Sequence, residues 1–174
     1  MAAAHQVVRV AILGAESSGK STLAAALAAR YDTLWVPEYL REFVDTRGRV
    51  PLEADQIDIA RSQMARENAA AAQARDFLFC DTTPMMTALY SRWYWNRVDA
   101  ELARIEVRHD YAFTFVTAPD APWEADGLQR ESDAVRQSIH QQVLRVLAER
   151  GIAHVLLRGS LDQRLDQVCR VLKR

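Results

Sequence analysis

The segment of this 174-residue chain with the clearest chemistry is Gly14-Ala-Glu-Ser-Ser-Gly19-Lys20-Ser21, which satisfies the pattern G-x-x-x-x-G-K-[ST] in full. A loop of this kind turns tightly at its glycines, so its backbone N–H groups can point inward at phosphate oxygens. The lysine would contact the β- and γ-phosphates, and the Ser21 hydroxyl would ligate Mg²⁺. The pattern therefore predicts an ATP and Mg²⁺ site made by Gly14, Glu16, Ser17, Ser18, Gly19, Lys20, Ser21 and Thr22.

The residues on both sides of this loop have the character that a phosphate-binding loop requires. The apolar run 7–14 is typical of a buried strand that ends at a glycine, and the run 20–30 of a helix. The N-terminus of that helix adds a positive dipole end beside the phosphates, and the hydroxyls of Ser17 and Ser18 could cap it. Lysine is rare in this chain, with only Lys20 and Lys173 among 22 basic residues, yet one stands where the loop needs it.

Two carboxylates follow the next predicted strands. Glu38 comes directly after the strand 33–37, and Asp81 ends the strand 76–81. Because the carboxyl ends of parallel strands meet at one edge of a sheet, both should lie near the phosphate loop. Glu38 suits a proton acceptor for an attacking hydroxyl and Asp81 suits Mg²⁺, although the two roles could be exchanged. Glu38 could instead simply favour the dipole of the helix after it.

Arginines with a possible role in binding phosphate or substrate occur in two places. Arg41 follows Glu38 and could hold a substrate oxygen or pair with a nearby glutamate. The segment 120–136 predicts a lid that closes over ATP, with Arg130 on the loop and Arg136 near the start of the next helix. These arginines would neutralise charge on the transferred phosphoryl group. Ordinary surface arginines are the alternative, because 22 basic residues with two lysines leave twenty arginines.

The remaining pattern predicts an α/β fold. One helix is expected at 54–75, with an inner stripe of Ile57, Ala60 and Met64. The stretch 83–107 should be helical in two pieces, and further helices are expected at 132–150 and at 160–173. Strands are expected at 111–119 and 152–159. Ser132 is a plausible N-cap and Gly151 a plausible C-cap for the helix between them. Alternating strands and helices indicate a parallel sheet with right-handed crossovers. We therefore expect a single domain, 1–174, with a five-stranded parallel sheet and helices on both faces.

Composition limits the class of protein. A net charge of −1 argues against a nucleic-acid-binding role, and no apolar run approaches the roughly 18 residues of a membrane span. The N-terminus lacks the pattern of a signal peptide, and Cys80 and Cys169 have neither metal-ligand nor redox spacing. These features predict a cytoplasmic protein with reduced cysteines and a small-molecule partner; they say nothing of its oligomeric state.

The motifs also separate classes of phosphate-loop protein. The chain has no N/T-K-x-D segment, and Asp81 is followed by Thr-Thr-Pro and not by x-x-Gly, which argues against a GTPase. It is short for a motor or oligomeric ATPase. A small-molecule kinase fits best. Its acceptor could be a nucleoside or a nucleoside monophosphate, and a regulatory module that binds ATP without turnover is the alternative from another class.

Several segments, taken in order, resemble the nicotinamide riboside kinase domain of the NadR proteins, which are P-loop kinases. They are GAESSGKSTL, PEYLREFV, IDIARSQ, FCDTT, APWEADGLQR and the closing GIAHVLLRGSLDQRL, and together they cover nearly the whole chain. The resemblance implies a strand order of 2-3-1-4-5 and transfer of the ATP γ-phosphate to the 5′-hydroxyl of nicotinamide riboside, giving nicotinamide mononucleotide for NAD synthesis. It implies that Glu38 is the base, that Asp81 serves magnesium or substrate, and that Arg130 and Arg136 are lid arginines.

The chain departs from that family at a few positions. Pro37 and Gln129 stand where the family pattern has tryptophan and arginine. NadR proteins carry a DNA-binding region and an adenylyltransferase domain before the kinase; six residues precede the first strand here, so a stand-alone kinase is expected. The flat, cationic nicotinamide ring favours an aromatic face. The candidates are Trp35, Tyr39, Tyr90, Trp93, Trp95 and Trp123, with Tyr39 and Trp123 preferred, and the expected substrate-binding set is Glu38, Tyr39, Arg41, Asp81, Trp123 and Asp126. Gln63 could bond a carboxamide or ribose hydroxyl, or be an ordinary exposed glutamine.

Overall fold

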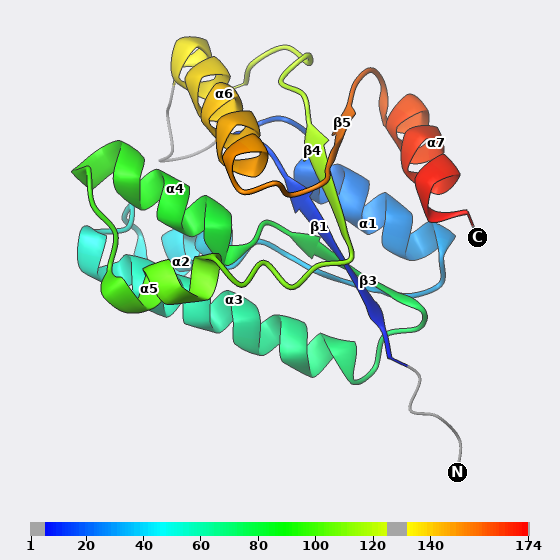
Figure 1. The fold of residues 1–174 in the computed structure, drawn as a ribbon, viewed down its shortest axis with the longest axis horizontal. Helices are drawn as coiled ribbons and strands as arrows, with labels where there is room; N and C mark the ends of the chain where they lie inside the picture. Colours follow the sequence, from blue (N-terminus) through cyan, green and yellow to red (C-terminus); the bar gives the residue numbers. More distant parts are fainter. Residues whose placement is uncertain (1–5, 125–131, 174) are drawn as a thin grey trace.

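Five parallel strands form one sheet in the order β2-β3-β1-β4-β5 in the computed structural model, which describes residues 6–124 and 132–173 (Figure 1). The strands are β1 (Val8–Leu13), β2 (Leu34–Val36), β3 (Phe77–Asp81), β4 (Phe113–Thr117) and β5 (Val155–Leu157). The predicted fold class and strand order are both confirmed. The central position of β1 fits its sequence, VRVAIL, because a middle parallel strand is covered on both faces, and the last four residues of β1 are apolar and fully buried.

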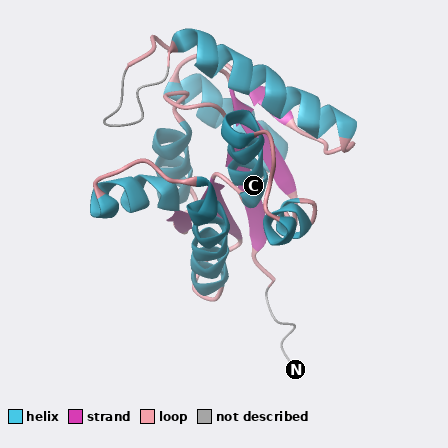
Figure 2. Cartoon of the chain, turned by 90° about the vertical axis from the view of Figure 1, so that its left-hand side faces the viewer, coloured by secondary structure: helices cyan, strands magenta, loops and turns pink. Residues whose placement is uncertain are grey.

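Helices cover both faces of the sheet (Figures 1 and 2). They are α1 (Lys20–Arg30), α2 (Tyr39–Arg47), α3 (Gln56–Ala71), α4 (Pro84–Trp95), α5 (Ala100–Glu106), α6 (Asp133–Glu149) and α7 (Leu161–Leu172), with a 3₁₀ turn at Glu53–Asp55. The stretch predicted to be helical in two pieces is α4 and α5. Ser132 caps α6 as expected, because its hydroxyl accepts a hydrogen bond from the Val135 N–H. Among the helices of the described ranges, none combines the length and apolar content of a bilayer crossing.

Alternate residues of β1 supply the two halves of the core. Val10 and Ile12 pack toward α1 and α7, together with Leu23, Leu27, Val168 and other buried residues. Ala11 and Leu13 pack toward α4 and α6, against side chains such as Met86, Ile139 and Val143. α3 covers the β2–β3 side, where Cys80 is buried; Cys80 and Cys169 are both free thiols, as expected. The two layers hold the carboxyl ends of the strands in fixed positions.

The helix predicted at 54–75 is the largest departure from expectation. The chain makes a 3₁₀ turn first, and α3 ends at Ala71. Of the expected inner stripe, Ala60 is buried and the half-buried Ile57 packs against the same cluster, whereas Met64 is half-buried and is not part of that cluster. The buried face carries Gln56, Ile59, Ala60, Gln63 and Glu67. Three of these five are polar, so a search for apolar periodicity assigns the buried face of the helix about one residue away from its true position.

Candidate active site

The phosphate loop connects β1 to α1, and its backbone requires glycine at two positions. Gly14 has a φ of +152°, and a Cβ there would lie 2.3 Å from the Thr117 hydroxyl oxygen and 2.7 Å from that of Ser18. Gly19 has a φ of +89° and is the N-cap of α1. Side chains are disfavoured at positive φ, so these glycines permit the turn that brings the start of α1 to the end of β1.

The two serines of the loop do not cap α1, contrary to expectation. The Ser18 hydroxyl donates to the Ala15 carbonyl at 2.6 Å and shares a 2.7 Å hydrogen bond with the Thr117 hydroxyl. The Ser17 hydroxyl donates to the Glu124 carbonyl at 3.0 Å. Both serines thus tie the loop to β4 and to the segment after it. Within the described residues, no side-chain bond caps the start of α1, which keeps its positive end for a ligand.

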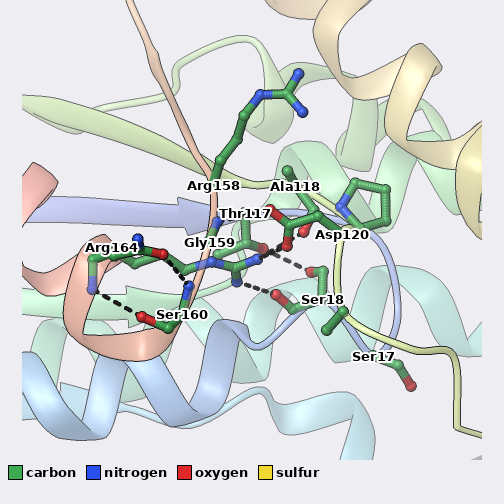
Figure 3. Close-up of polar contacts among 12 residues, drawn as sticks. Ser17, Ser18, Thr117, Ala118, Asp120, Arg158, Gly159, Ser160 and Arg164 are labelled. Atoms are coloured by element: carbon green, nitrogen blue, oxygen red, sulfur yellow. Dashed lines mark hydrogen bonds and ion pairs between the residues drawn. The ribbon is translucent and has the colours of Figure 1, made fainter.

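Two buried arginines support the loop, and sequence reasoning assigned this role to neither of them. Arg164 of α7 donates to the Ser18 carbonyl at 2.5 Å, to the Ala118 carbonyl at 2.9 Å and to the Asp120 carboxylate at 2.5 Å (Figure 3). Arg136 of α6 donates to the Ser17 carbonyl at 3.2 Å and to the Ala121 carbonyl at 2.9 Å. Arg136 was expected to contact ATP from a lid; the structure instead commits its guanidinium to the loop backbone and to Asp133.

Arg164→Met is expected to weaken ATP binding about 10- to 100-fold. The substitution leaves the Ser18 and Ala118 carbonyls without this donor, at about 1–3 kcal/mol for a buried acceptor left unsatisfied, removes the ion pair with the partly exposed Asp120, and frees the loop to move. Calorimetric titration with a non-hydrolysable ATP analogue measures the effect. Arg158→Met is the control, because Arg158 is exposed and its side chain points away from this cluster (Figure 3). Equal affinities for the two variants would contradict the supporting role of Arg164.

A cavity of about 950 Å³ opens beside the phosphate loop, a size typical of small-molecule sites. One end is lined by loop residues 16–22, including Lys20, whose ammonium donates to the Ala15 carbonyl at 3.1 Å. The other wall carries three aromatic side chains of α4, Tyr90, Tyr94 and Trp95. The cavity therefore has a cationic end for phosphates and an aromatic side for a flat ring.

Glu38 lines the cavity and lies directly before α2. Burial raises the pKa of its carboxyl above the ordinary value, and the nearby Asp81 raises it further, while Lys20 and Arg41 oppose the rise. A carboxylate whose pKa is raised in this way is a better proton acceptor than an exposed one. Glu38 thus lies at the cavity wall, within electrostatic reach of Lys20 of the phosphate loop.

Asp81 ends β3 and has no solvent exposure. One carboxylate oxygen accepts a 2.5 Å hydrogen bond from the Ser21 hydroxyl. The other is buried, with no hydrogen-bond partner anywhere in the described part of the chain. A buried, half-satisfied carboxylate beside the phosphate-loop serine fits Mg²⁺, which takes oxygen ligands, several of them commonly from water and nucleotide phosphates. No group of three or more His, Cys, Asp or Glu side chains occurs within residues 6–124 and 132–173 that could hold a metal.

The other predicted site residues lie in different places. Arg41 lines the cavity. Tyr39 does not; its ring packs against the small α2–α3 cluster and lies 4.6 Å from the Arg66 guanidinium of α3. Trp123 is half-buried and is likewise absent from the described lining. The aromatic side chains that line the cavity are therefore those of α4 and not the preferred Tyr39 and Trp123. Tyr90 and Trp95 were among the candidates from the sequence, and Tyr94 was missed. Asp126 and Arg130 lie outside the described residues.

Behind the cavity, a buried carboxylate of α3 contacts the sheet. Glu67 is 1% exposed, and the Tyr111 hydroxyl donates to its carboxylate, lying 3.0 and 2.8 Å from the two oxygens. Arg9 lies 3.8 Å away. Burial raises the pKa of Glu67 to about 7, although Tyr111, Arg9, Cys80 and Gln63 all lower it in part. The charged form is therefore costly to bury at neutral pH.

Glu67→Gln is expected to remove a pH-dependent loss of stability. The folded pKa of about 7 lies above the unfolded value of 4.5, so the folded state binds more protons between these values and loses stability as pH rises through them. Relative to the variant, the native chain should lose up to about 3 kcal/mol between pH 4.5 and 8. Urea unfolding of both proteins at pH 5 and pH 8 measures this. A stability difference between the two proteins that is the same at both pH values would contradict this expectation. Glu149→Gln, a substitution at an exposed position, is the control and should differ from the native chain equally at both pH values.

The fold and site together define a P-loop protein of the kinase type. More specifically, residues 9–164 match the family described as AAA domain (AAA_28), and the chain belongs to that family. It is 30% identical over 155 residues to the trifunctional NAD biosynthesis/regulator protein NadR of Escherichia coli K12, covering 84% of this chain but 37% of that one. The chain thus spans little more than a third of this relative.

Solved structures show the same fold. A NadR protein in complex with NR superposes with a TM-score of 0.82 at 21% identity, covering 97% of this chain and 52% of that one. Deoxyadenosine kinase of M. mycoides, with dCMP and dCDP bound, gives a TM-score of 0.64 at 11% identity, over 95% and 99% of the two chains. At such identities the likeness concerns the fold.

Proposed function

We propose that this protein transfers the γ-phosphoryl group of ATP to the 5′-hydroxyl of nicotinamide riboside, giving nicotinamide mononucleotide and ADP. The observation that carries the proposal is the single cavity that joins the phosphate loop, the Glu38 carboxylate and the aromatic wall of α4. The similarity to NadR over most of the chain supports the choice of acceptor.

Each side chain has a definite role in this reaction. The loop N–H groups and Lys20 bind the β- and γ-phosphates, which places the γ-phosphorus at the Glu38 side of the cavity. Glu38 accepts the proton of the 5′-hydroxyl while the hydroxyl oxygen forms a bond to the γ-phosphorus. At the same time the bond from that phosphorus to the ADP oxygen breaks. Ser21 and Asp81 would hold Mg²⁺, which supplies positive charge to the phosphate oxygens.

The aromatic wall gives the acceptor its orientation. Tyr90, Tyr94 and Trp95 come from one helix, and the rings of Tyr90 and Tyr94 stack with centroids 6.2 Å apart. A nicotinamide ring is flat and positively charged, so an electron-rich ring face attracts it by cation–π interaction as well as by stacking. A neutral base would gain the stacking alone. This wall therefore favours the cationic nucleoside.

An acceptor panel tests the proposal. ADP formation is measured with Mg-ATP and, in separate assays, nicotinamide riboside, uridine, cytidine, adenosine, thymidine and nucleoside monophosphates, with the product identified by mass. The highest kcat/KM is expected for nicotinamide riboside. A higher value for another acceptor would overturn the assigned substrate while keeping the kinase reaction. Tight ATP binding without acceptor-dependent ADP would overturn the kinase and favour a regulatory ATP-binding module.

A further inference from the structure

One buried glutamine connects the two chain segments that carry Glu38 and Asp81. Gln63 of α3 is 2% exposed and lines the cavity. Its side-chain carbonyl accepts a 2.8 Å hydrogen bond from the Tyr39 N–H, in the peptide bond that joins Tyr39 to Glu38. Its amide nitrogen lies 3.5 Å from the Asp81 carbonyl, to which it donates. A single side chain thus holds the backbone at both carboxylates.

The orientation of the Gln63 amide is fixed by its partners. The Tyr39 N–H can only donate, so the amide oxygen must face it. The Asp81 carbonyl can only accept, so the amide nitrogen must face that side, where a further hydrogen bond joins Gln63 to the buried Glu67. With these partners the amide is not available to select a substrate, which was one of the roles considered from the sequence.

The start of α2 shows why this arrangement matters for Glu38. Glu38 is the N-cap of α2, a position whose side chain commonly accepts hydrogen bonds from the first turn. In the described chain its carboxylate makes no such capping bond. Gln63 accepts from the first N–H of the helix, that of Tyr39, so the peptide bond that follows Glu38 is tied to α3. The Glu38 carboxylate, which makes no capping bond, lines the cavity.

We infer that Gln63 is a positioning residue, which fixes the backbone at Glu38 and at Asp81 relative to each other. The inference rests on the proposed function for the catalytic role of Glu38. Without Gln63, the peptide bond after Glu38 loses its anchor on α3. The Glu38 carboxylate would then move relative to the hydroxyl that it must deprotonate, and such misplacement commonly costs about 100-fold in rate.

Gln63→Met, which keeps the length of the side chain and removes its hydrogen bonds, tests the inference. We expect kcat to fall about 10- to 100-fold while the KM for ATP changes less than about threefold. The acid limb of the kcat/KM profile should move to lower pH, because a Glu38 carboxylate released from its position loses part of the burial that raises its pKa. The charged groups that act on Glu38, namely Lys20, Asp81 and Arg41, are unchanged in this variant.

A double-mutant cycle separates positioning from general loss of structure. In the Glu38→Gln background, Gln63→Met should cost less than about threefold, because the residue through which it acts is already disabled. Leu102→Val, in the core between α3 and α5, is the destabilised control and should leave the pH profile unchanged. Equal effects of Gln63→Met in both backgrounds, or a pH profile that does not move, would overturn the inference. If Gln63→Met does not fold, Gln63→Asn, whose amide is too short to reach Tyr39, replaces it with the same expectations.

A measurement without turnover keeps this inference distinct from the proposed function. The Glu38 carboxyl can be titrated by NMR in protein labelled at the glutamate side-chain carboxyl, with its signal assigned by its loss in Glu38→Gln. A lower pKa of Glu38 in Gln63→Met would support the positioning role even if no acceptor were phosphorylated. An unchanged pKa would overturn it even if the kinase reaction were demonstrated.

Discussion

Lys20→Met is expected to lower kcat/KM for acceptor phosphorylation by at least about 1,000-fold. Lys20 lies at the phosphate end of the cavity and is only 9% exposed. Its ammonium would meet the negative charge that shifts between the β- and γ-phosphates during transfer, in a site where little water screens the interaction. Methionine keeps the length of the side chain, so the lost quantity is the charge and not the packing.

Steady-state rates of ADP formation, with product identified by mass, measure this loss. Lys173→Met is the matched control, because Lys173 is the other lysine of the chain and is exposed after the end of α7. It should leave the rate unchanged. A Lys20→Met protein that retains more than about a tenth of the native rate would contradict the assignment of this loop to phosphoryl transfer.

Glu38→Gln is expected to lower kcat by about 10²- to 10⁴-fold, the range for loss of a general base, while ATP affinity stays within about threefold. The amide keeps the size and burial of the side chain but cannot accept the proton. Because burial raises the pKa of the Glu38 carboxyl, the native activity should decline with acid at a higher pH than an exposed glutamate would give. The variant should lack this acid limb.

Single-turnover rates and separate titrations with an ATP analogue distinguish the lost chemistry from lost binding. Glu42→Gln serves as the control on the same helix, since Glu42 is exposed and pairs with Arg66 outside the cavity. Undiminished turnover of Glu38→Gln would exclude Glu38 as the base. Asp81, the alternative from the sequence, would then take that role.

The sheet and the phosphate loop are predictable because their signals are local. The loop has four fixed positions between a strand and a helix. The apolar runs that form β1 and β3 can be recognised from neighbouring residues alone. Glu38 and Asp81 follow from the rule that ligands bind at the carboxyl ends of parallel strands. The edge strand β5 is shorter than its apolar run, since Val155–Leu157 alone pairs with β4.

The supporting residues are not predictable, because their roles come from contacts across long separations in sequence. Arg164 reaches Ser18 over 146 positions, and Gln63 reaches Tyr39 over 24. As polar residues on helices, both are expected at the surface from their type alone. The aromatic wall was only partly found, since nothing in the spacing of Tyr90, Trp93 and Trp95 says which face of α4 borders the cavity.

A competition experiment tests the central claim most directly. The protein is given Mg-ATP and equal amounts of nicotinamide riboside, cytidine, uridine and adenosine in one vessel, and the products are identified by mass and by the phosphorus coupling of the 5′-carbon in NMR. Nicotinamide mononucleotide, phosphorylated on the 5′-oxygen, is predicted to form first and to dominate until its precursor is consumed. Preferential phosphorylation of another nucleoside, or of any other hydroxyl, would contradict the proposed function.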